Sequence, residues 1–380
     1  MRTMSPATRM DSLEDIRREI HGNITRACRS LYRIDNRAGT GLDYFEPWPH
    51  QRLMFTALQG QRAAGDPPRI VCLKTRRAGT STASATWTFN EFYWQPRRHA
   101  LAVAHHDTTT AIIYQIYRTL YEELPPELQQ PLQKLNRKEL ACETPWSSNL
   151  VAQTAGYLDI GRGPTVQHAH LSEIDFWPDP ETALDGILNA VTLHPATSII
   201  IESTANGADG WLHHFWRESV KGKSGFIPLF QPWFAVPEHR LKLPAGFEAT
   251  TEERERMAEF VLDLHQIAWY RRKMNETISK EPWGGERKMR QEHPHTAEEA
   301  FQASGFCIFP DSVLARQREA VRAPDHCVRL FAVGPGEFKP ERSEWVDGSL
   351  AIWRKPEEGR QYSLGVDVSD GVGATESVVR

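Results

Sequence analysis

The chain has 380 residues, with 45 Lys plus Arg against 49 Asp plus Glu and a net charge of -4. That length predicts two or three domains, and the slight acidity restricts any nucleic-acid binding to local basic patches. The five cysteines are scattered without a C-x-x-C pair, which argues against a disulfide framework or a zinc site and fits a reducing cytosol. No apolar segment approaches the ~20 residues that span a bilayer, and the N-terminus lacks a signal-peptide pattern, so we expect a soluble intracellular protein.

The apolar pattern changes several times along the chain. Residues 11–35 carry apolar positions at helical spacing, which predicts an amphipathic helix or a pair of helices. From about Pro68, short apolar runs alternate with helical stretches such as "TTTAIIYQIYRTLYEEL". This alternation predicts βαβ units and a mostly parallel sheet buried on both faces. The predicted strands are "RIVCLK", "ALAVAH", "TVQHAHLS" and "SIIIES".

The C-terminal third has a different texture. Residues 225–305 are rich in Trp, Pro and charge, and we expect them to be mainly helical. A polar, Pro-rich stretch predicts a linker over residues 311–344. From residue 345 a new strand pattern begins, with "SLAIWRK" and "YSLGVDVSDGVG" as a strand pair.

The stretch "KTRRAGTS" after the first predicted strand resembles a phosphate-binding loop with its lysine displaced. In the pattern G-x-x-x-x-G-K-[ST], Gly79 and Ser81 match, Thr80 stands at the lysine position, and Lys74 stands at the first glycine. Both ends of such a loop lie close to one phosphate, so a lysine side chain from the first position could reach the same oxygens. The alternative is an ordinary strand–turn–helix with surface basic residues, and the loop alone does not decide.

The order of the following segments favours the working loop. "VQHAHLSEIDFW" ends a strand with Ser172-Glu173, an acidic Walker-B position at the carboxyl end of a strand, where ligands of α/β folds bind. "SIIIESTANGADGW" ends another strand with a short polar segment. Upstream, "FEPWPHQRLMF" carries Gln51, whose carboxamide suits the edge of adenine; a surface Gln on a helix is the alternative.

In this order the segments resemble the large subunit of a tailed-bacteriophage terminase, the ATP-driven motor that packages DNA into proheads. "KTRRAGTS" fits that family's variant loop K-x-x-R-x-G-x-S, "HLSE" with a following aromatic fits its Walker-B variant, and "ESTANG" fits its coupling motif. "MRQEHPHTAEEAFQASGFCIF" resembles the end of the motor domain, and "YSLGVDVSDG" resembles the first strand of the family's nuclease.

The resemblance implies a fold and a domain order. The fold is a P-loop ATPase of the ASCE type with a mostly parallel α/β sheet, followed by the truncated start of an RNase H-like nuclease domain. The implied parts are an N-terminal helical segment (1–47), the ATPase domain (48–310) with a helical lid at about 225–305, the linker (311–344) and the incomplete nuclease (345–380).

Phosphoryl transfer needs charge neutralisation on the β- and γ-phosphates, a metal and a positioned water. We therefore assign Lys74 to the phosphates and Ser81 to Mg²⁺, and the resemblance assigns Glu173 to the attacking water. Arg76 or Arg77 is a candidate arginine finger in cis, because a guanidinium spreads charge over the γ-phosphate; simple pairing with a carboxylate is the alternative.

Other residues complete the predicted site. Ser172 replaces the usual Walker-B aspartate, and Asp175 is either its substitute or, as we favour, a solvated helix N-cap. The polar segment 203–206 would sense hydrolysis and move a neighbouring subdomain, or it is a plain turn. The predicted nucleotide-binding set is Gln51, Lys74, Thr75, Arg76, Arg77, Ala78, Gly79, Thr80, Ser81, Ser203, Thr204 and Asn206.

Nuclease and DNA contacts are the weakest part of the pattern. The resemblance assigns Asp367 to a catalytic Mg²⁺ or Mn²⁺ ion, but two-metal cutting needs several converging carboxylates, so we expect no complete nuclease site in this chain. The basic runs 95–99, 270–274 and 284–290 are candidates for gripping DNA phosphates. Each run could equally be a solvated helix face.

The resemblance implies a motor that moves double-stranded DNA into a prohead, with endonuclease activity in the complete protein. Its implied partners are DNA, the terminase small subunit and the portal protein, on which it would form a homo-oligomeric ring in the host cytoplasm. A helicase-like or restriction-type translocase is the rival within enzymes. A nucleotide-binding structural protein that does not hydrolyse ATP is the rival outside them.

Overall fold

The computed structural model describes residues 13–156, 165–208, 210–282, 284–302, 326–334, 337–343, 350–352, 357, 359–360, 366–367 and 378–379. The chain divides into two units, Met1–Phe306 and Cys307–Arg380, which we describe separately. Among the described residues, no helix has the length and apolar character needed to cross a membrane.

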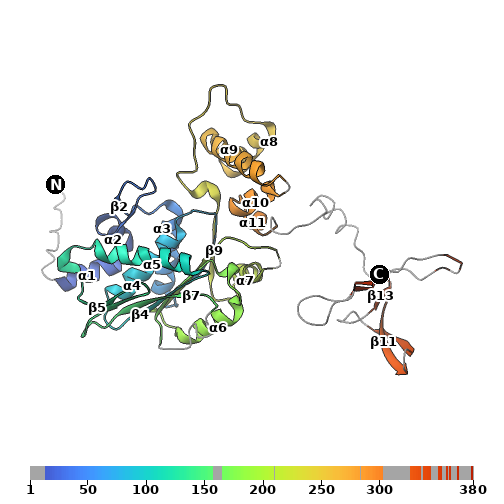
Figure 1. Ribbon diagram of the computed structural model, residues 1–380, viewed down its shortest axis with the longest axis horizontal. Helices are drawn as coiled ribbons and strands as arrows, with labels where there is room; N and C mark the ends of the chain where they lie inside the picture. Colours follow the sequence, from blue (N-terminus) through green and yellow to red (C-terminus); the bar gives the residue numbers. More distant parts are fainter. Residues whose placement is uncertain are drawn as a thin grey trace, which may run out of the picture. The chain divides into compact units, whose positions relative to one another are not determined.

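An eight-stranded sheet forms the centre of the first unit (Figure 1). Six neighbouring strands run parallel, and the last two are antiparallel. The mostly parallel sheet predicted from the sequence is thereby confirmed. In spatial order the strands are β10 (Ile227–Gln231), β3 (Arg69–Lys74), β9 (Ser198–Ser203), β8 (His168–Ser172), β4 (His99–Ala104), β7 (Asn149–Thr154), β6 (Glu139–Cys142) and β5 (Leu132–Leu135).

Helices cover both faces of this sheet (Figure 1). Alternate side chains of one strand enter different cores, as the pleat requires: Ile70 and Cys72 belong to one core, and Val71 and Leu73 to the other. Because both faces are buried, the central strands consist of continuous apolar runs. One face carries α1 (Leu13–Gly22), α2 (Ile24–Ser30), α3 (Pro49–Ala64), α4 (Thr80–Tyr93) and α5 (Asp107–Glu122), and the other carries α6 (Pro180–Ala190) and α7 (Trp211–Val220).

The N-terminal segment forms the predicted helix pair, α1 and α2. The side chain of Asn23 accepts a hydrogen bond from the amide of Arg26 and so caps the second helix. A short antiparallel hairpin that the sequence did not reveal follows it, made of β1 (Arg33–Asp35) and β2 (Leu42–Tyr44). This hairpin carries Arg37, which reaches the loop after β3.

A helical lid follows the sheet and has its own small core around the fully buried Trp233. The prediction that residues 225–305 are mainly helical is wrong at its start, because β10 pairs with β3 and belongs to the central sheet. The helical part begins only after this strand. The lid helices are α8 (Thr251–Phe260), α9 (Leu264–Lys280), α10 (Gly285–Glu292) and α11 (Ala297–Gln302).

Two predictions for the second unit are also wrong. The predicted linker contains an antiparallel hairpin of β11 (His326–Gly334) and β12 (Glu337–Ser343), whose "CVRLFAV" run has strand propensity. The strand from "SLAIWRK", β13 (Leu350–Ile352), pairs with β11 instead of with "YSLGVDVSDG". That later segment supplies β14 (Val366–Asp367), which pairs with β15 (Val378–Val379). The RNase H-like fold stays a prediction.

Candidate active site

Three parallel strands of the central sheet end at one edge and bring the predicted site residues together. Lys74 is the last residue of β3, Ser203 ends β9, and Ser172 ends β8, with Glu173 directly after it. Strand β9 lies between β3 and β8. Ligands of open α/β sheets bind at such carboxyl edges, so the predicted location of the site is consistent with the topology.

Lys74 lies between two carboxylates at this edge. Its Nζ is 2.8 Å from Oε1 of Glu173 and 2.8 Å from Oε2 of Glu202. Lys74 is 7% exposed and Glu202 is fully buried. The second oxygen of Glu202 lies 3.2 Å from Nε2 of His170, whose Nδ1 bonds to the hydroxyl of Tyr117. The displaced lysine is therefore directed into the site and held by charge.

The ion pairs determine the charge states of these buried groups. Burial alone would lower the pKa of Lys74, but the two carboxylates together outweigh it and raise that pKa above its ordinary value. Burial would raise the pKa of Glu202, but Lys74 and His170 outweigh it and lower the pKa to about 2. Near neutral pH, Lys74 is therefore protonated and Glu202 is ionised.

Glu173 also contacts the predicted coupling segment. Its Oε2 accepts hydrogen bonds from the Thr204 amide (3.1 Å), the Ser203 hydroxyl (3.3 Å) and the Thr204 hydroxyl (3.3 Å). Its backbone has a φ of 53°, a left-handed conformation that non-glycine residues adopt with strain. The loop lysine, the predicted catalytic carboxylate and the coupling segment thus form one bonded group.

The loop between β3 and α4 leaves backbone donors available for an anion. Gly79 is the N-cap of α4, with a φ of 69° and no side-chain capping bond. Among the described residues, the amides from Arg77 to Thr82 have no hydrogen-bond acceptor. Consecutive free amides at a helix N-terminus favour phosphate binding. The loop therefore fits a phosphate.

Mg²⁺ binds through one or two protein oxygens together with substrate phosphates. Ser81 is the second residue of α4 and is half-buried beside the free amides. Its hydroxyl is a hard oxygen ligand of the kind that this ion prefers, and the phosphates would supply others. The residues at this edge therefore fit a nucleotide with its magnesium.

Gln51 holds the loop in place. Its Nε2 donates to the carbonyl of Gly79 at 2.9 Å, and its Oε1 accepts from the Trp48 amide at 2.7 Å, which caps α3. The side chain is 2% exposed. His50 adds a second bond, from Nε2 to the carbonyl of Ala78 at 2.8 Å. The contact of Gln51 with adenine stays a prediction.

The two loop arginines differ in their surroundings. Arg76 pairs with Glu292 of the lid at 2.6 Å, so pairing with a carboxylate, the alternative to a finger, describes this residue. Arg77 is exposed, has a left-handed φ of 59°, and its guanidinium has no partner among the described residues. Arg77 is consequently the better placed of the two for a finger role.

Two threonines of the loop are structural in this conformation. The Thr75 hydroxyl donates to the backbone carbonyl of Glu292 at 3.0 Å, which joins the loop to the lid. The Thr80 hydroxyl donates to the side chain of Gln231 at the end of β10. Both side chains are buried. They fix the two ends of the loop.

The prediction that Asp175 is a solvated N-cap is wrong. Asp175 is 8% exposed, and its carboxylate accepts hydrogen bonds from the amides of Asn206 (2.7 Å) and Leu212 (2.9 Å). Burial outweighs these bonds and raises its pKa above the ordinary value. Asn206 in turn donates from Nδ2 to the carbonyl of Asp175 at 3.1 Å. Asp175 thus orders the coupling segment and the start of α7.

Sequence reasoning missed Glu202, although it is the buried partner of Lys74. The signal was present, because a carboxylate inside the apolar run "SIIIES" is rare without a paired charge. Asp367 is the last residue of β14, and its side chain lies outside the described residues.

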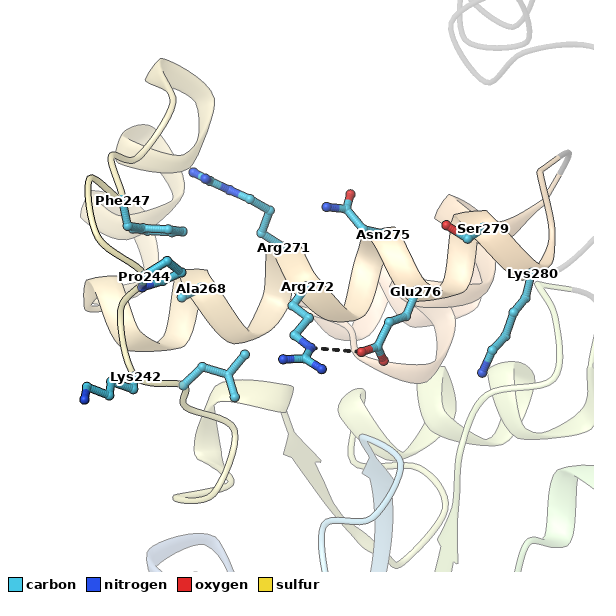
Figure 2. Close-up of a pocket in the computed structure, with 11 residues that line it drawn as sticks. Lys242, Pro244, Phe247, Ala268, Arg271, Arg272, Asn275, Glu276, Ser279 and Lys280 are labelled. Atoms are coloured by element: carbon cyan, nitrogen blue, oxygen red, sulfur yellow. Dashed lines mark hydrogen bonds and ion pairs between the residues drawn. The ribbon is translucent and has the colours of Figure 1, made fainter.

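The basic run 270–274 borders a groove on the lid, about 820 Å³ in volume (Figure 2). Arg271 pairs with Glu253 and lies over the ring of Phe247, and Arg272 pairs with Glu276. The groove is lined by Leu241, Lys242, Pro244, Phe247, Ala268, Arg271, Arg272, Asn275, Glu276, Ser279 and Lys280. Since both arginines are neutralised by carboxylates, the solvated helix face describes this run better than a DNA grip.

The other two basic runs differ from each other. In the run 284–290, Lys288 pairs with Glu281 and Arg290 pairs with Glu286 on the surface of α10. In the run 95–99, Arg98 lines a second cavity of the first unit and has no ion pair among the described residues. Among the described residues of the three runs, Arg98 therefore combines an uncompensated charge with a place in a cavity wall.

No family model and no curated protein matches the chain. Solved structures similar to it include the large terminase of bacteriophage HK97, with 16% identity, a TM-score of 0.47, and coverage of 69% of this chain and 52% of that one. Another is the large terminase of a thermophilic bacteriophage in complex with ADP, with 12% identity, a TM-score of 0.39, and coverage of 57% and 50%. The ATPase domain of the Thermus phage P74-26 large terminase is also similar, with 16% identity, a TM-score of 0.36, and coverage of 56% of this chain and 89% of that one. The chain spans about half the length of the first two of these terminases.

Proposed function

We propose that the first unit is an ATPase of the terminase large-subunit type. The observation that carries the proposal is the convergence at the carboxyl edge of the sheet, where Lys74 of the loop lies 2.8 Å from Glu173. The sequence predicted a phosphate role for one and a water-activating role for the other. Burying charges is costly. We therefore interpret the buried pair of Lys74 and Glu173 as part of a working loop and not as a remnant of a damaged one.

Each residue then has a task. ATP with Mg²⁺ would supply the γ-phosphoryl group that is transferred to water. The free amides from Arg77 to Thr82 hold its phosphates, Ser81 contributes its hydroxyl, and Lys74 exchanges Glu173 for phosphate oxygens. Glu202 stays behind the lysine and keeps it extended into the site. Glu173, once released, is free to accept a proton from the attacking water.

The coupling of hydrolysis to movement follows from the same contacts. Glu173 bonds to Ser203 and Thr204, and the next residues contact the lid, because Gln291 donates to the carbonyl of Ala205. A change at Glu173 is therefore passed to the lid through adjoining hydrogen bonds. The motor would use this movement to translocate double-stranded DNA into a prohead.

The partners and the second activity belong to the same proposal and rest on the motif resemblance. They are double-stranded DNA, the terminase small subunit, the portal protein and further copies in a ring, in the host cytoplasm. Endonuclease activity with Mg²⁺ or Mn²⁺ through Asp367 is expected of the complete protein.

The test separates nucleotide binding from hydrolysis. Glu173→Gln keeps the shape of the side chain but removes its charge, so ATP turnover should fall by about 10²–10⁴-fold while ATP affinity changes little. Glu259→Gln, an exposed site on α8, is the control. Turnover is measured with and without duplex DNA. If Glu173→Gln retains normal turnover, or if the unaltered chain neither binds nor hydrolyses ATP, the proposal is wrong.

A further inference from the structure

A second cavity lies at the opposite, amino-terminal edge of the central sheet. It has a volume of about 240 Å³ and is lined by His21, Arg62, Glu91, Gln95, Arg98, His168, His194, Pro195 and Ala196. Arg98 directly precedes β4, and His168 is the first residue of β8. Strand β8 has five residues, so the cavity is roughly 15 Å from the nucleotide edge. A nucleotide bound at Lys74 does not occupy it.

Part of the cavity wall is internally neutralised. Arg62 binds the carboxylate of Glu91 with two hydrogen bonds, of 2.9 and 2.6 Å. His21 lies 3.4 Å from the same carboxylate through Nε2, and Gln95 lies 3.4 Å from His21 Nδ1. The charge of Glu91 is therefore already balanced by Arg62. The guanidinium of Arg98 is the uncompensated charge of the cavity, because it has no partner among the described residues.

His168 presents a buried donor to this cavity. The ring is 1% exposed, and its Nδ1 lies 2.9 Å from the hydroxyl of Ser198. That hydroxyl accepts from the Trp87 indole, and we assign the tautomer in which it also donates its own proton to Nδ1. Burial lowers the pKa of His168 to about 3, so the ring is neutral, and in the assigned tautomer its proton is on Nε2. Among the described residues, that N–H has no acceptor.

His194 supplies a matching donor from another element. Its Nδ1 accepts a hydrogen bond from the amide of Ala196 at 3.0 Å. A ring nitrogen that accepts carries no proton, so the proton of His194 is on Nε2. Two imidazole donors and one guanidinium thus line a single cavity. They come from the start of β4, the start of β8 and the loop after α6.

We propose that this cavity binds a phosphate group through Arg98, His168 and His194. Three donors from three elements suit a tetrahedral anion with several acceptor oxygens, and arginine is the residue most suited to phosphate. The volume is about eight times the ~30 Å³ of one water molecule, which accommodates a phosphate and its nearest waters. The basic run 95–99 singled out in the sequence supplies Arg98. The phosphate is either free inorganic phosphate or part of a nucleic-acid backbone.

The experiment follows the imidazole resonances of His168 and His194 in the full chain. The resonances are assigned with His168→Gln and His194→Gln, and the chain is titrated separately with inorganic phosphate and with a short DNA duplex. For whichever titrant shifts the resonances, Arg98→Gln should lower the binding affinity by about tenfold or more, as expected for the loss of a charged hydrogen bond. Arg97→Gln is the matched control, since this neighbouring arginine is exposed and does not line the cavity. The readout uses no ATP, so it is independent of the proposed ATPase.

Each outcome decides something. Shifts with inorganic phosphate that Arg98→Gln weakens and Arg97→Gln does not support the site and identify free phosphate as sufficient. Shifts only with DNA, again dependent on Arg98, support it and identify the nucleic-acid backbone as the source. No shift with either titrant, or equal weakening by both arginine variants, overturns the proposal. Equal urea midpoints of the variants exclude unfolding as the cause of a loss.

Discussion

Glu202→Gln should destabilise the first unit by about 3 kcal/mol at neutral pH. The pKa of Glu202 is lowered from 4.5 to about 2, mainly because Lys74 and His170 outweigh the effect of burial. Each unit of pKa corresponds to about 1.4 kcal/mol, so this shift is worth about 3 kcal/mol. Loss of one partner from a buried ion pair costs about 3–5 kcal/mol, which is consistent.

The pH dependence of the free energy of unfolding is a second measurable effect of the lowered pKa of Glu202. A carboxylate with a lowered folded pKa contributes stability that is fully present above its unfolded pKa and is lost as the pH falls through its folded pKa. The parent protein should therefore lose about 3 kcal/mol more than Glu202→Gln between about pH 5 and pH 2. Near pH 2 the two proteins should be almost equally stable.

Urea unfolding followed by tryptophan fluorescence at a series of pH values measures both effects. Glu259→Gln, an exposed carboxylate on α8, is the control for the change of composition. A neutral-pH loss below about 1 kcal/mol would mean that desolvation cancels the ion pairs. A parallel pH dependence of parent and variant would show that Glu202 is not held ionised by Lys74. Either result refutes the account of this network.

Further predictions concern the loop. Arg77→Ala should lower the turnover of ATP by about 10³-fold with little change in ATP affinity, as for an arginine finger. Arg76→Ala should lower turnover much less, because the side chain of Arg76 pairs with Glu292. Steady-state rates measure turnover and calorimetry measures affinity, and equal effects of the two variants would contradict the assignment. Gly79→Ala should cost about 1–2 kcal/mol, because its φ is 69° and the new Cβ would lie 2.7 Å from Nε2 of Gln51; ATP binding should weaken with it, and unchanged unfolding and binding would contradict this.

The parts of the fold visible in the sequence were those with a continuous apolar signal. Strands β3, β8 and β9 are buried along their whole length, so their sequences are bounded apolar runs. Strand β5 has one half-buried and three exposed residues and showed no pattern. Strand β10 is only partly buried and contains Pro228, which is uncommon inside a strand, so the sequence of this Trp- and Pro-rich region did not predict a strand there.

The site was predictable where chemistry follows a strand directly. Lys74 and Glu173 could be placed at one edge because the strands that they end or follow are parallel, whereas the water-activating role of Glu173 came from the resemblance and stays a prediction. The need of Glu202 for a paired charge was visible, but its partner was not, because the partner depends on the register that places Glu202 opposite Cys72 on β3 and Ser172 on β8. Such cross-strand pairing is a tertiary property, and the periodicity of a single chain does not encode it.

The central claim is that Lys74 performs the task of the loop's missing lysine. Calorimetric titration of the chain with ATP and Mg²⁺, comparing the parent with Lys74→Met and with the double variant Lys74→Met/Glu202→Gln, tests it most directly. The double variant removes the lysine together with its fully buried partner, so a loss of binding there is not a consequence of an unpaired carboxylate at position 202, and Glu173 keeps its hydrogen bonds to Ser203 and Thr204. Lys221→Ala, an exposed lysine after α7, is the control. We predict that both Lys74 variants lose ATP affinity by about 10²-fold, as expected for a charged phosphate contact, and lose turnover. Parental affinity and turnover in the folded double variant would contradict the claim.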